Sequence, residues 1–135
     1  MTTLALPKPG RRRMPAGVYW AVTILLAFDF GFGGLSSLLG VPAAKEVFSR
    51  LGYPGYFERY LALWELLGVA ALLIPGPRRL REWAYAGLAF DAISAVYSLH
   101  AIGSPLVQLL PALITLGLLL ASYAGWQQRE PGREA

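Results

Sequence analysis

The sequence predicts an all-α protein whose four helices cross a membrane as one bundle, with both termini in the cytoplasm. Of its 135 residues, 56% are hydrophobic and only 15% are charged, and the mean hydropathy is +0.47. Ordinary soluble domains are about 25% charged, so this composition favours a lipid environment. Four apolar segments and the placement of the basic residues supply the rest of the prediction.

The four segments cover about residues 16–40, 57–74, 83–102 and 105–126. A spanning helix needs about 20 mainly apolar residues, and the second segment is short by that measure. A soluble helical bundle is the alternative, but it would need a polar stripe along each helix, which the last segment lacks. One membrane domain, 16–126, is therefore expected between a basic, unstructured tail (1–15) and a C-terminal tail (127–135).

Prolines separate the segments, since proline cannot continue the helical hydrogen-bond ladder. Pro42 follows the first segment, and the Pro-Gly-Pro run at 75–77 ends the second. Ser104 and Pro105 predict an N-cap and a first-turn proline for the fourth. Residues 45–51 suit a short helix on the outer surface, with a solvated loop as the alternative.

The basic residues set the orientation. With four spans, nine of the 12 Lys and Arg residues fall on one side and three on the other. The positive-inside rule then places both termini in the cytoplasm, whereas an odd number of spans would separate the two basic tails. The net charge of +4 is explained by topology and attraction to anionic lipid headgroups, so no nucleic-acid partner is expected.

Ionisable residues inside the predicted spans are the candidate site. Asp29, Glu65, Asp91 and His100 all lie there, and a carboxylate in mid-bilayer should face the bundle interior, because exposure to hydrocarbon is costly. Helix rise places Asp29 and Glu65 at similar depth, so the two could share one proton if their helices are neighbours. Asp91 and Tyr97 share a helical stripe that predicts a polar interior extending toward His100.

The functional interpretation is a polar pocket that binds a small lipophilic molecule or passes protons. Its candidate ligand-binding residues are Asp29, Glu65, Asp91, Trp64, Tyr97 and His100, in which the aromatic rings supply walls and hydrogen-bond donors. The alternative is that these groups hydrogen-bond to one another and lock the helix packing. Taken alone, His100 fits an interfacial histidine better than a ligand.

Several function classes are excluded or disfavoured. The chain has no cysteine and one histidine, which excludes disulfides, thiolate metal sites and a bis-histidine haem within it. It has no nucleophile elbow, zinc-protease motif or phosphate-binding loop. No metal site and no catalytic residue are predicted.

Three runs then resemble the DoxX-like family of small four-helix bacterial membrane proteins. They are Leu-Gly-Tyr-Pro at 51–54, Glu-Leu-Leu-Gly at 65–68 and Arg-Glu-Trp-Ala-Tyr-Ala-Gly at 81–87, and the similarity covers about 16–126. One departure is that the family often carries a lysine after a glycine near the end of the first helix, where this chain has serines at 36 and 37.

The resemblance implies a multi-pass protein of the bacterial inner membrane in a quinone or lipid context, since the family is named after a subunit of a thiosulfate:quinone oxidoreductase. It implies no covalently bound cofactor. Moving electrons would require an external cofactor, such as a quinone, or a partner redox subunit.

The run at 81–87 also has a structural interpretation. Glu82 would cap the start of the third span, where the helix dipole favours an anion, and Arg81 or a neighbouring arginine would pair with it. Trp83 would anchor the helix at the membrane interface.

Two alternatives to a ligand-binding protein stay open. One is an assembly subunit, or a homo-oligomer, that packs small-residue stripes such as Gly117, Ala121 and Gly125 against other membrane helices. The other is a proton-coupled transporter, which the lack of an inverted repeat disfavours.

Overall fold

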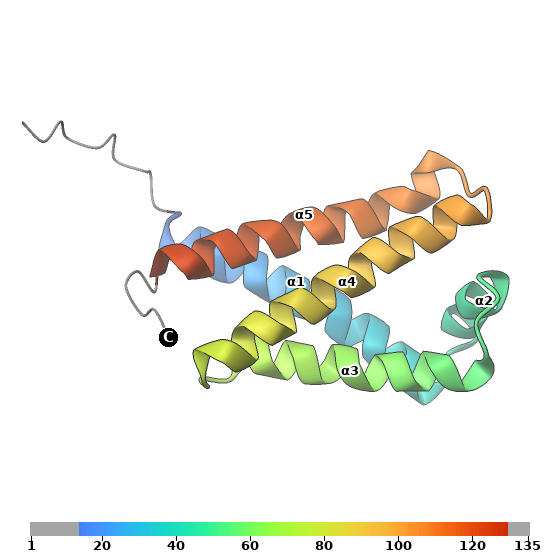
Figure 1. Cartoon of the computed structure of the whole chain (residues 1–135), viewed down its shortest axis with the longest axis horizontal. Coiled ribbons are helices and arrows are strands. Elements are labelled where there is room, and N and C mark those ends of the chain that lie inside the picture. The colour runs from blue at the N-terminus through green and yellow to red at the C-terminus, as the bar shows by residue number, and fades with distance from the viewer. Residues whose placement is uncertain (1–13, 130–135) are drawn as a thin grey trace, which may run out of the picture.

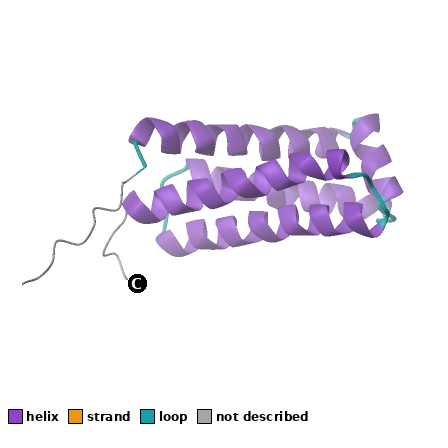
Figure 2. Cartoon of the chain, turned by 90° about the horizontal axis from the view of Figure 1, so that it is seen from above, coloured by secondary structure: helices purple, strands orange, loops and turns teal. Residues whose placement is uncertain are grey.

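The computed structural model describes residues 14–129, and in that range it contains helices and loops but no strand (Figure 2). In chain order the helices are α1 (Ala16–Leu39), α2 (Pro42–Arg50), α3 (Gly55–Leu73), α4 (Arg78–Ala101) and α5 (Leu106–Arg129). The all-α prediction is confirmed. Residues 1–13 and 130–135 of the predicted tails lie outside the described residues, whereas residues 127–129 continue α5.

The four long helices run back and forth beside one another (Figure 1). α1 packs on α3 and α5, and α4 packs on the same two helices. The start of α1 meets the end of α5, where the backbone N–H of Met14 donates to Gln128 Oε1 over 2.7 Å. The turn between α3 and α4 lies at this same end, and α2 lies at the opposite end. Each long helix therefore has two long neighbours, an inner face and an outer face.

Prolines mark the helix starts. Pro15, Pro54 and Pro77 each directly precede a helix. Gly40 directly follows the last residue of α1, and its φ of 75° is a left-handed conformation that glycine adopts without a Cβ clash. The N-cap predicted at Ser104 is wrong: its buried Oγ has no hydrogen-bond partner among the described residues, and the helix begins only at Leu106.

α4 begins five residues before the predicted span. It starts at Arg78, directly after Pro77, and its first turn holds no acidic residue. Glu82 therefore lies too far along the helix to cap its exposed N–H groups, and the predicted capping role is wrong. Instead, Arg78 Nε donates to Glu82 Oε1 over 3.3 Å, an i,i+4 ion pair on the helix surface.

Arg81 lies near an aromatic ring instead of pairing with Glu82. Its guanidinium carbon is 6.0 Å from the ring centre of Trp126, and that of Arg78 is 5.8 Å away. Both arginines thus bring the start of α4 to the end of α5 through cation–π contacts. Trp83 points outward and is 75% exposed, as an anchoring side chain would be.

The short helix expected at 45–51 is present as α2, so the loop alternative is wrong. Pro42 is its first residue, a position where the missing N–H costs nothing. None of its residues is buried. Arg50 Nη2 donates to Gln108 Oε1 over 3.1 Å, which links α2 to the start of α5.

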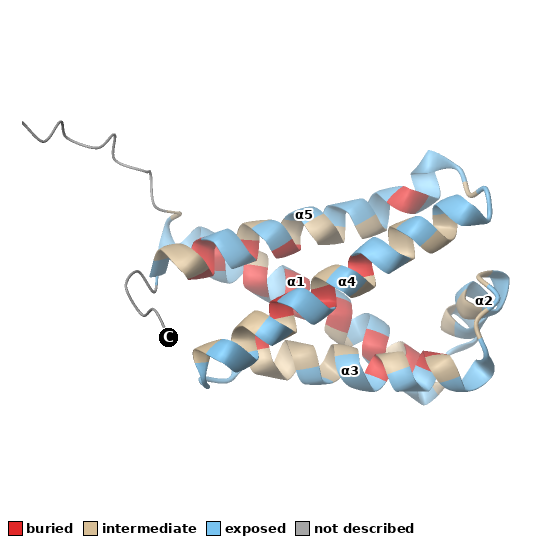
Figure 3. Cartoon of the chain, in the orientation of Figure 1, coloured by how far each residue is buried: buried red, intermediate tan, exposed pale blue. Residues whose placement is uncertain are grey.

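The outer faces of the long helices are strongly apolar. Figure 3 shows exposed residues along all four, and they include large side chains such as Phe28 on α1, Leu63 on α3, Phe90 on α4 and Ile114 on α5. α1 and α5 are long and apolar enough to cross a membrane, and only 33% and 17% of their apolar windows are buried inside the protein. The core helix of a soluble protein would be mostly buried, so the low burial of α1 and α5 favours their assignment as membrane spans.

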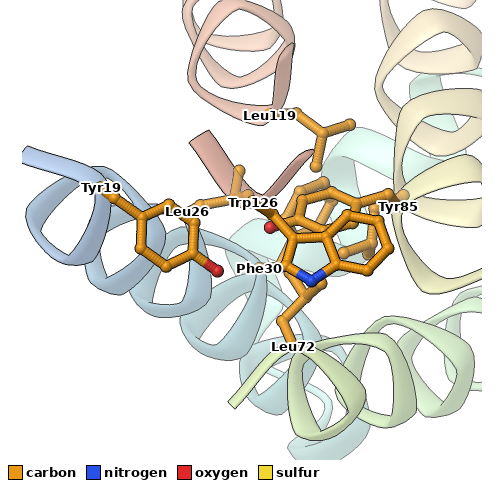
Figure 4. Packing of buried hydrophobic residues seen from close by; sticks show 8 residues of the cluster. Tyr19, Leu26, Phe30, Leu72, Tyr85, Leu119 and Trp126 are labelled. Carbon is orange, nitrogen blue, oxygen red and sulfur yellow. The ribbon is translucent and has the colours of Figure 1, made fainter. Parts of the chain in front are cut away.

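The buried core joins all four long helices (Figure 4). Leu26 on α1, Leu72 on α3, Leu88 on α4 and Leu119 on α5 are each at most 3% exposed. Tyr19, Phe30, Tyr85 and Trp126 complete the cluster. These side chains pack the four helices together in the half of the bundle that contains the start of α1 and the end of α5.

Glycines allow close approach at particular points. A Cβ on Gly68 would lie 3.1 Å from Leu88 Cδ2, and one on Gly125 would lie 2.8 Å from Tyr19 Cδ2. A Cβ on Gly117 would meet nothing within 4 Å. The small-residue stripe of α5 is therefore split: Gly125 packs against α1, and Gly117 faces open space.

Candidate functional site

The three carboxyls predicted to lie inside the membrane line one cavity, in which Asp29 is exposed and Glu65 and Asp91 are half-buried. It has a volume of about 170 Å³, and all four long helices line it. The lining residues are Asp29, Phe30, Gly33, Glu65, Asp91, Ala92, Ala95, Ala112 and Thr115. Small side chains from α4 and α5 leave the space that the carboxyls border. We call Asp29, Glu65, Asp91 and Thr115 the carboxyl layer.

Glu65 on α3 and Asp91 on α4 are neighbours, since both line the cavity and the space between these two helices. Two neighbouring carboxyls can hydrogen-bond to one another only when one of them carries a proton, because ionised carboxylates only accept. Asp29 is near enough to add its charge to the environment of Glu65. The sharing of a proton by Asp29 and Glu65 stays a prediction, and the hydrogen bond that the structure gives Asp29 comes from Thr115.

Asp29 has a hydroxyl partner. The Thr115 hydroxyl lies 2.6 Å from Asp29 Oδ2 and 2.9 Å from the carbonyl oxygen of Pro111, so its hydrogen faces two acceptors. This contact ties α1 to α5. Sequence reasoning missed Thr115 as a site residue. The signal was a hydroxyl one turn after a proline, inside an otherwise apolar helix.

Gly34 lets α3 come close to this layer. A Cβ at that position would lie 3.3 Å from Glu65 Oε2 and 3.2 Å from Leu66 Cγ. Any side chain there would press on the carboxyl and on the helix behind it. The glycine on α1 thus helps to set where the Glu65 carboxyl lies.

No basic residue balances these carboxyls. None of the residues that line the cavity is Lys, Arg or His. Within 14–129, the ion pair found joins Arg78 to Glu82, near the turn between α3 and α4. The carboxyl layer therefore brings three carboxyls together without a cationic side chain in the lining of the cavity.

An apolar groove adjoins the cavity. It lies between α3 and α4, has a volume of about 300 Å³, and shares Glu65 and Asp91 with the cavity as lining residues. Its other walls are almost entirely apolar: Leu61, Trp64, Leu67, Gly68, Ala71, Leu80, Trp83, Ala84, Gly87 and Leu88. The volume falls at the lower end of the range of about 300–1,000 Å³ for ligand pockets. Glu65 and Asp91 thus lie where the central cavity and the apolar groove adjoin.

Of the predicted aromatic site residues, Trp64 lines this groove, whereas Tyr97 does not. Tyr97 and His100 line a separate groove of about 370 Å³ between α4 and α5. His100 follows Asp91 by nine residues, which is two and a half turns at 3.6 residues per turn and puts it on the opposite face of α4. The polar interior therefore does not continue from Asp91 to His100.

A second polar cluster lies two turns nearer the termini. The Ser122 hydroxyl on α5 is 2.7 Å from Thr23 Oγ1 on α1 and 2.8 Å from Tyr85 OH on α4. All three residues are buried, and Thr23 and Ser122 are fully inaccessible. We call Thr23, Tyr85 and Ser122 the hydroxyl layer. The sequence did not predict this cluster.

No group of three or more His, Asp or Glu side chains suited to a metal ion occurs among residues 14–129. The arrangement instead offers three carboxyls, the Thr115 hydroxyl and an adjoining apolar space. Such a site can hold the polar end of an amphiphilic molecule and exchange protons with it.

Comparison with known proteins gives one match. The family model of the DoxX-like family matches residues 21–122, a range that contains the whole carboxyl layer. No curated protein and no protein of solved structure matches the chain.

Proposed function

Starting from the fact that the chain belongs to the DoxX-like family of membrane proteins, we propose that it binds a lipophilic ligand, a quinone or a lipid, inside a four-span bundle. The ligand's polar group lies at Glu65 and Asp91, and its apolar part lies in the groove between α3 and α4. In this proposal the protein acts as the membrane subunit of a redox system in the bacterial inner membrane.

One observation carries the proposal: the same two carboxyls line both the central cavity and the apolar groove. A ligand site typically combines apolar walls with a few convergent polar groups. Here the polar groups sit where the two spaces meet, so one amphiphilic molecule can occupy both. The groove opens toward the outer face of the helices, where lipid would supply such molecules.

The four-span arrangement is supported by the outer faces. α3 and α4 expose large apolar side chains such as Leu67 and Phe90, as α1 and α5 do. In water those faces would be costly, whereas lipid accommodates them. Arg79 and Arg129 lie at the end where α1 begins and α5 stops, so the positive-inside rule places this end in the cytoplasm.

The test begins with the full chain purified in mild detergent, followed by lipid extraction and native mass spectrometry. We expect a quinone or lipid to copurify. Decylubiquinone is then titrated into protein in phosphatidylcholine nanodiscs while tryptophan fluorescence is followed, because Trp64 and Trp83 line the groove. Binding should quench that fluorescence to a saturable extent.

Two glycine variants make the test specific to the groove. A Cβ on Gly87 meets nothing within 4 Å, and Gly87 lines the groove, so Gly87→Leu should fill it without disturbing the helix contacts. Gly117→Leu is the matched control, because Gly117 also faces open space but lies outside the groove. We expect at least a tenfold loss of affinity for Gly87→Leu and none for Gly117→Leu. Equal binding by the two variants would contradict the proposal.

A partner subunit is the second candidate, and the open space at Gly117 favours it. The glycine lies on an exposed apolar face of α5, where another membrane helix could approach closely. In that case Gly117→Leu would abolish association with the partner and Gly87→Leu would not. The same pair of variants thus separates the two functions.

A further inference from the structure

The groove between α3 and α4 has a direction. Glu65 and Asp91 lie near one end, and Leu80 and Ala71 lie near the other, close to the turn between the helices. The stretch from Leu80 to Asp91 covers about 16 Å of helix at 1.5 Å per residue. A single unbranched chain can therefore lie along the groove with its polar end at the carboxyls.

At the polar end of the groove, three carboxyls come together and no cationic side chain lies among them. The lining residues of the groove and the cavity include three carboxyls and no Lys, Arg or His. Charges in a low-dielectric interior are stable only when they are paired. A neutral headgroup would leave the carboxyl layer without a counter-charge, whereas a cationic headgroup would supply one.

An ammonium group suits these partners best. It brings one positive charge and three N–H donors, which match carboxylate oxygens. Trp64, next to Glu65 in sequence, lines the groove and adds a ring face that attracts cations. Both features favour a protonated amine over the carbonyl groups of a quinone, which can only accept hydrogen bonds.

We infer that the groove and the carboxyl layer together form a site for a lipophilic amine with one alkyl chain, its ammonium group bound between Glu65, Asp91 and Asp29 and its chain lying along α3 and α4. This inference rests on the proposed function, since it names the ligand class for the same site. It identifies charge, and not only apolar area, as the basis of selectivity.

The test compares matched probes on the full chain in phosphatidylcholine nanodiscs, with empty nanodiscs as the blank for partition into lipid. The probes are dodecylamine and dodecanol, which share a chain and differ in the cationic group, together with decylubiquinone. We expect dodecylamine to bind at least tenfold more tightly than dodecanol. Equal affinities for these two probes would overturn the inference.

Amide variants locate the selectivity. Glu65→Gln and Asp91→Asn each remove an ionisable carboxyl from the groove and should each lower the preference for dodecylamine over dodecanol at least tenfold. Glu82→Gln is the control, because Glu82 is also a carboxyl of α4 but lies outside the groove and the cavity. An amine preference that survives in both amide variants would also overturn the inference.

The outcomes separate this inference from the proposed function. If an amide variant fails to fold, Gly87→Leu replaces it and should weaken both single-chain probes. The proposed function stands and the inference is wrong if decylubiquinone binds, if Gly87→Leu weakens that binding, and if dodecylamine binds no more tightly than dodecanol. If no probe binds in a way that depends on Gly87 and no lipid copurifies, both are wrong.

Discussion

The carboxyl layer and the hydroxyl layer are built alike and differ in what they leave unpaired. α1, α4 and α5 contribute a polar residue to each layer, six or seven residues apart along each helix, which is about two turns. In the hydroxyl layer the Ser122 hydroxyl contacts both Thr23 and Tyr85, so each of the three hydroxyls has a partner. In the carboxyl layer a cavity of about 170 Å³ remains, bordered by acidic groups without a protein cation.

The remaining long helix, α3, accounts for the difference between the two layers. α3 supplies Glu65 to the carboxyl layer, whereas seven residues later it supplies Leu72, which is 2% exposed, to the core beside the hydroxyl layer. Leucine fills space and brings no charge, so the hydroxyls can satisfy each other. The comparison teaches that buried polar residues indicate a ligand site when they are charged, border free space and lack partners. Fully paired hydroxyls indicate helix packing.

The largest expected effect concerns the leucines that separate the two layers. Leu119 is 1% exposed, and Leu119→Ala would leave a cavity between the layers. We expect the free energy of unfolding to fall by about 2–3 kcal/mol, from lost packing and unfilled volume. Unfolding by sodium dodecyl sulfate in mixed micelles, followed by circular dichroism, measures it. A loss below about 1 kcal/mol would mean that the leucines do not hold the two layers apart.

The hydroxyl layer should matter for stability and not for ligand binding. Ser122→Ala removes the shared partner of Thr23 and Tyr85, and hydrogen bonds between membrane helices contribute about 0.6–1.7 kcal/mol. We therefore expect a loss of about 1 kcal/mol in the same unfolding assay. Decylubiquinone affinity should stay within twofold of the unmodified chain. A variant that unfolds normally but binds tenfold more weakly would place function in the hydroxyl layer instead.

The smallest effect on stability is expected in the carboxyl layer itself. Glu65→Gln keeps the size of the side chain, retains hydrogen-bonding capacity and removes an ionisable group from the interior. The free energy of unfolding should stay within about 0.5 kcal/mol or rise, because an uncompensated buried charge is costly. The assay is again unfolding in mixed micelles, with no probe present. A clear destabilisation would show that the pair of carboxyls serves packing.

Part of the site could be predicted from the chain alone. A carboxyl inside an apolar segment should avoid lipid, so Asp29, Glu65 and Asp91 were predicted to face the interior. All three line one cavity, where Glu65 and Asp91 are half-buried and Asp29 is exposed. Tyr97 and His100 were included because they follow Asp91 on the same helix. Their offset around the helix turns them to another groove, and a more careful use of the 3.6-residue period would have separated them.

Pairings were harder to predict. Depth along the helix favoured Asp29 with Glu65, but depth does not determine which side chains touch. The partners depend on the rotation of each helix about its axis, which packing sets through residues such as Gly34 and Gly68. The same reason explains why the sequence did not predict the roles of Thr115, Thr23 and Ser122. A lone hydroxyl in an apolar helix has no preferred partner until the neighbouring helices are placed.

The sequence by itself determined that the chain is helical, that its outer faces are apolar, where prolines separate the long helices and which acidic residues lie within the apolar segments. These follow from local backbone chemistry and from the cost of exposing charge to hydrocarbon, and both act on each segment separately. Only the tertiary structure decided that Glu65 lies beside Asp91, that Asp29 meets Thr115, and that an apolar groove ends at these carboxyls. Those features arise where separate helices meet, and the order of residues along one helix does not contain them.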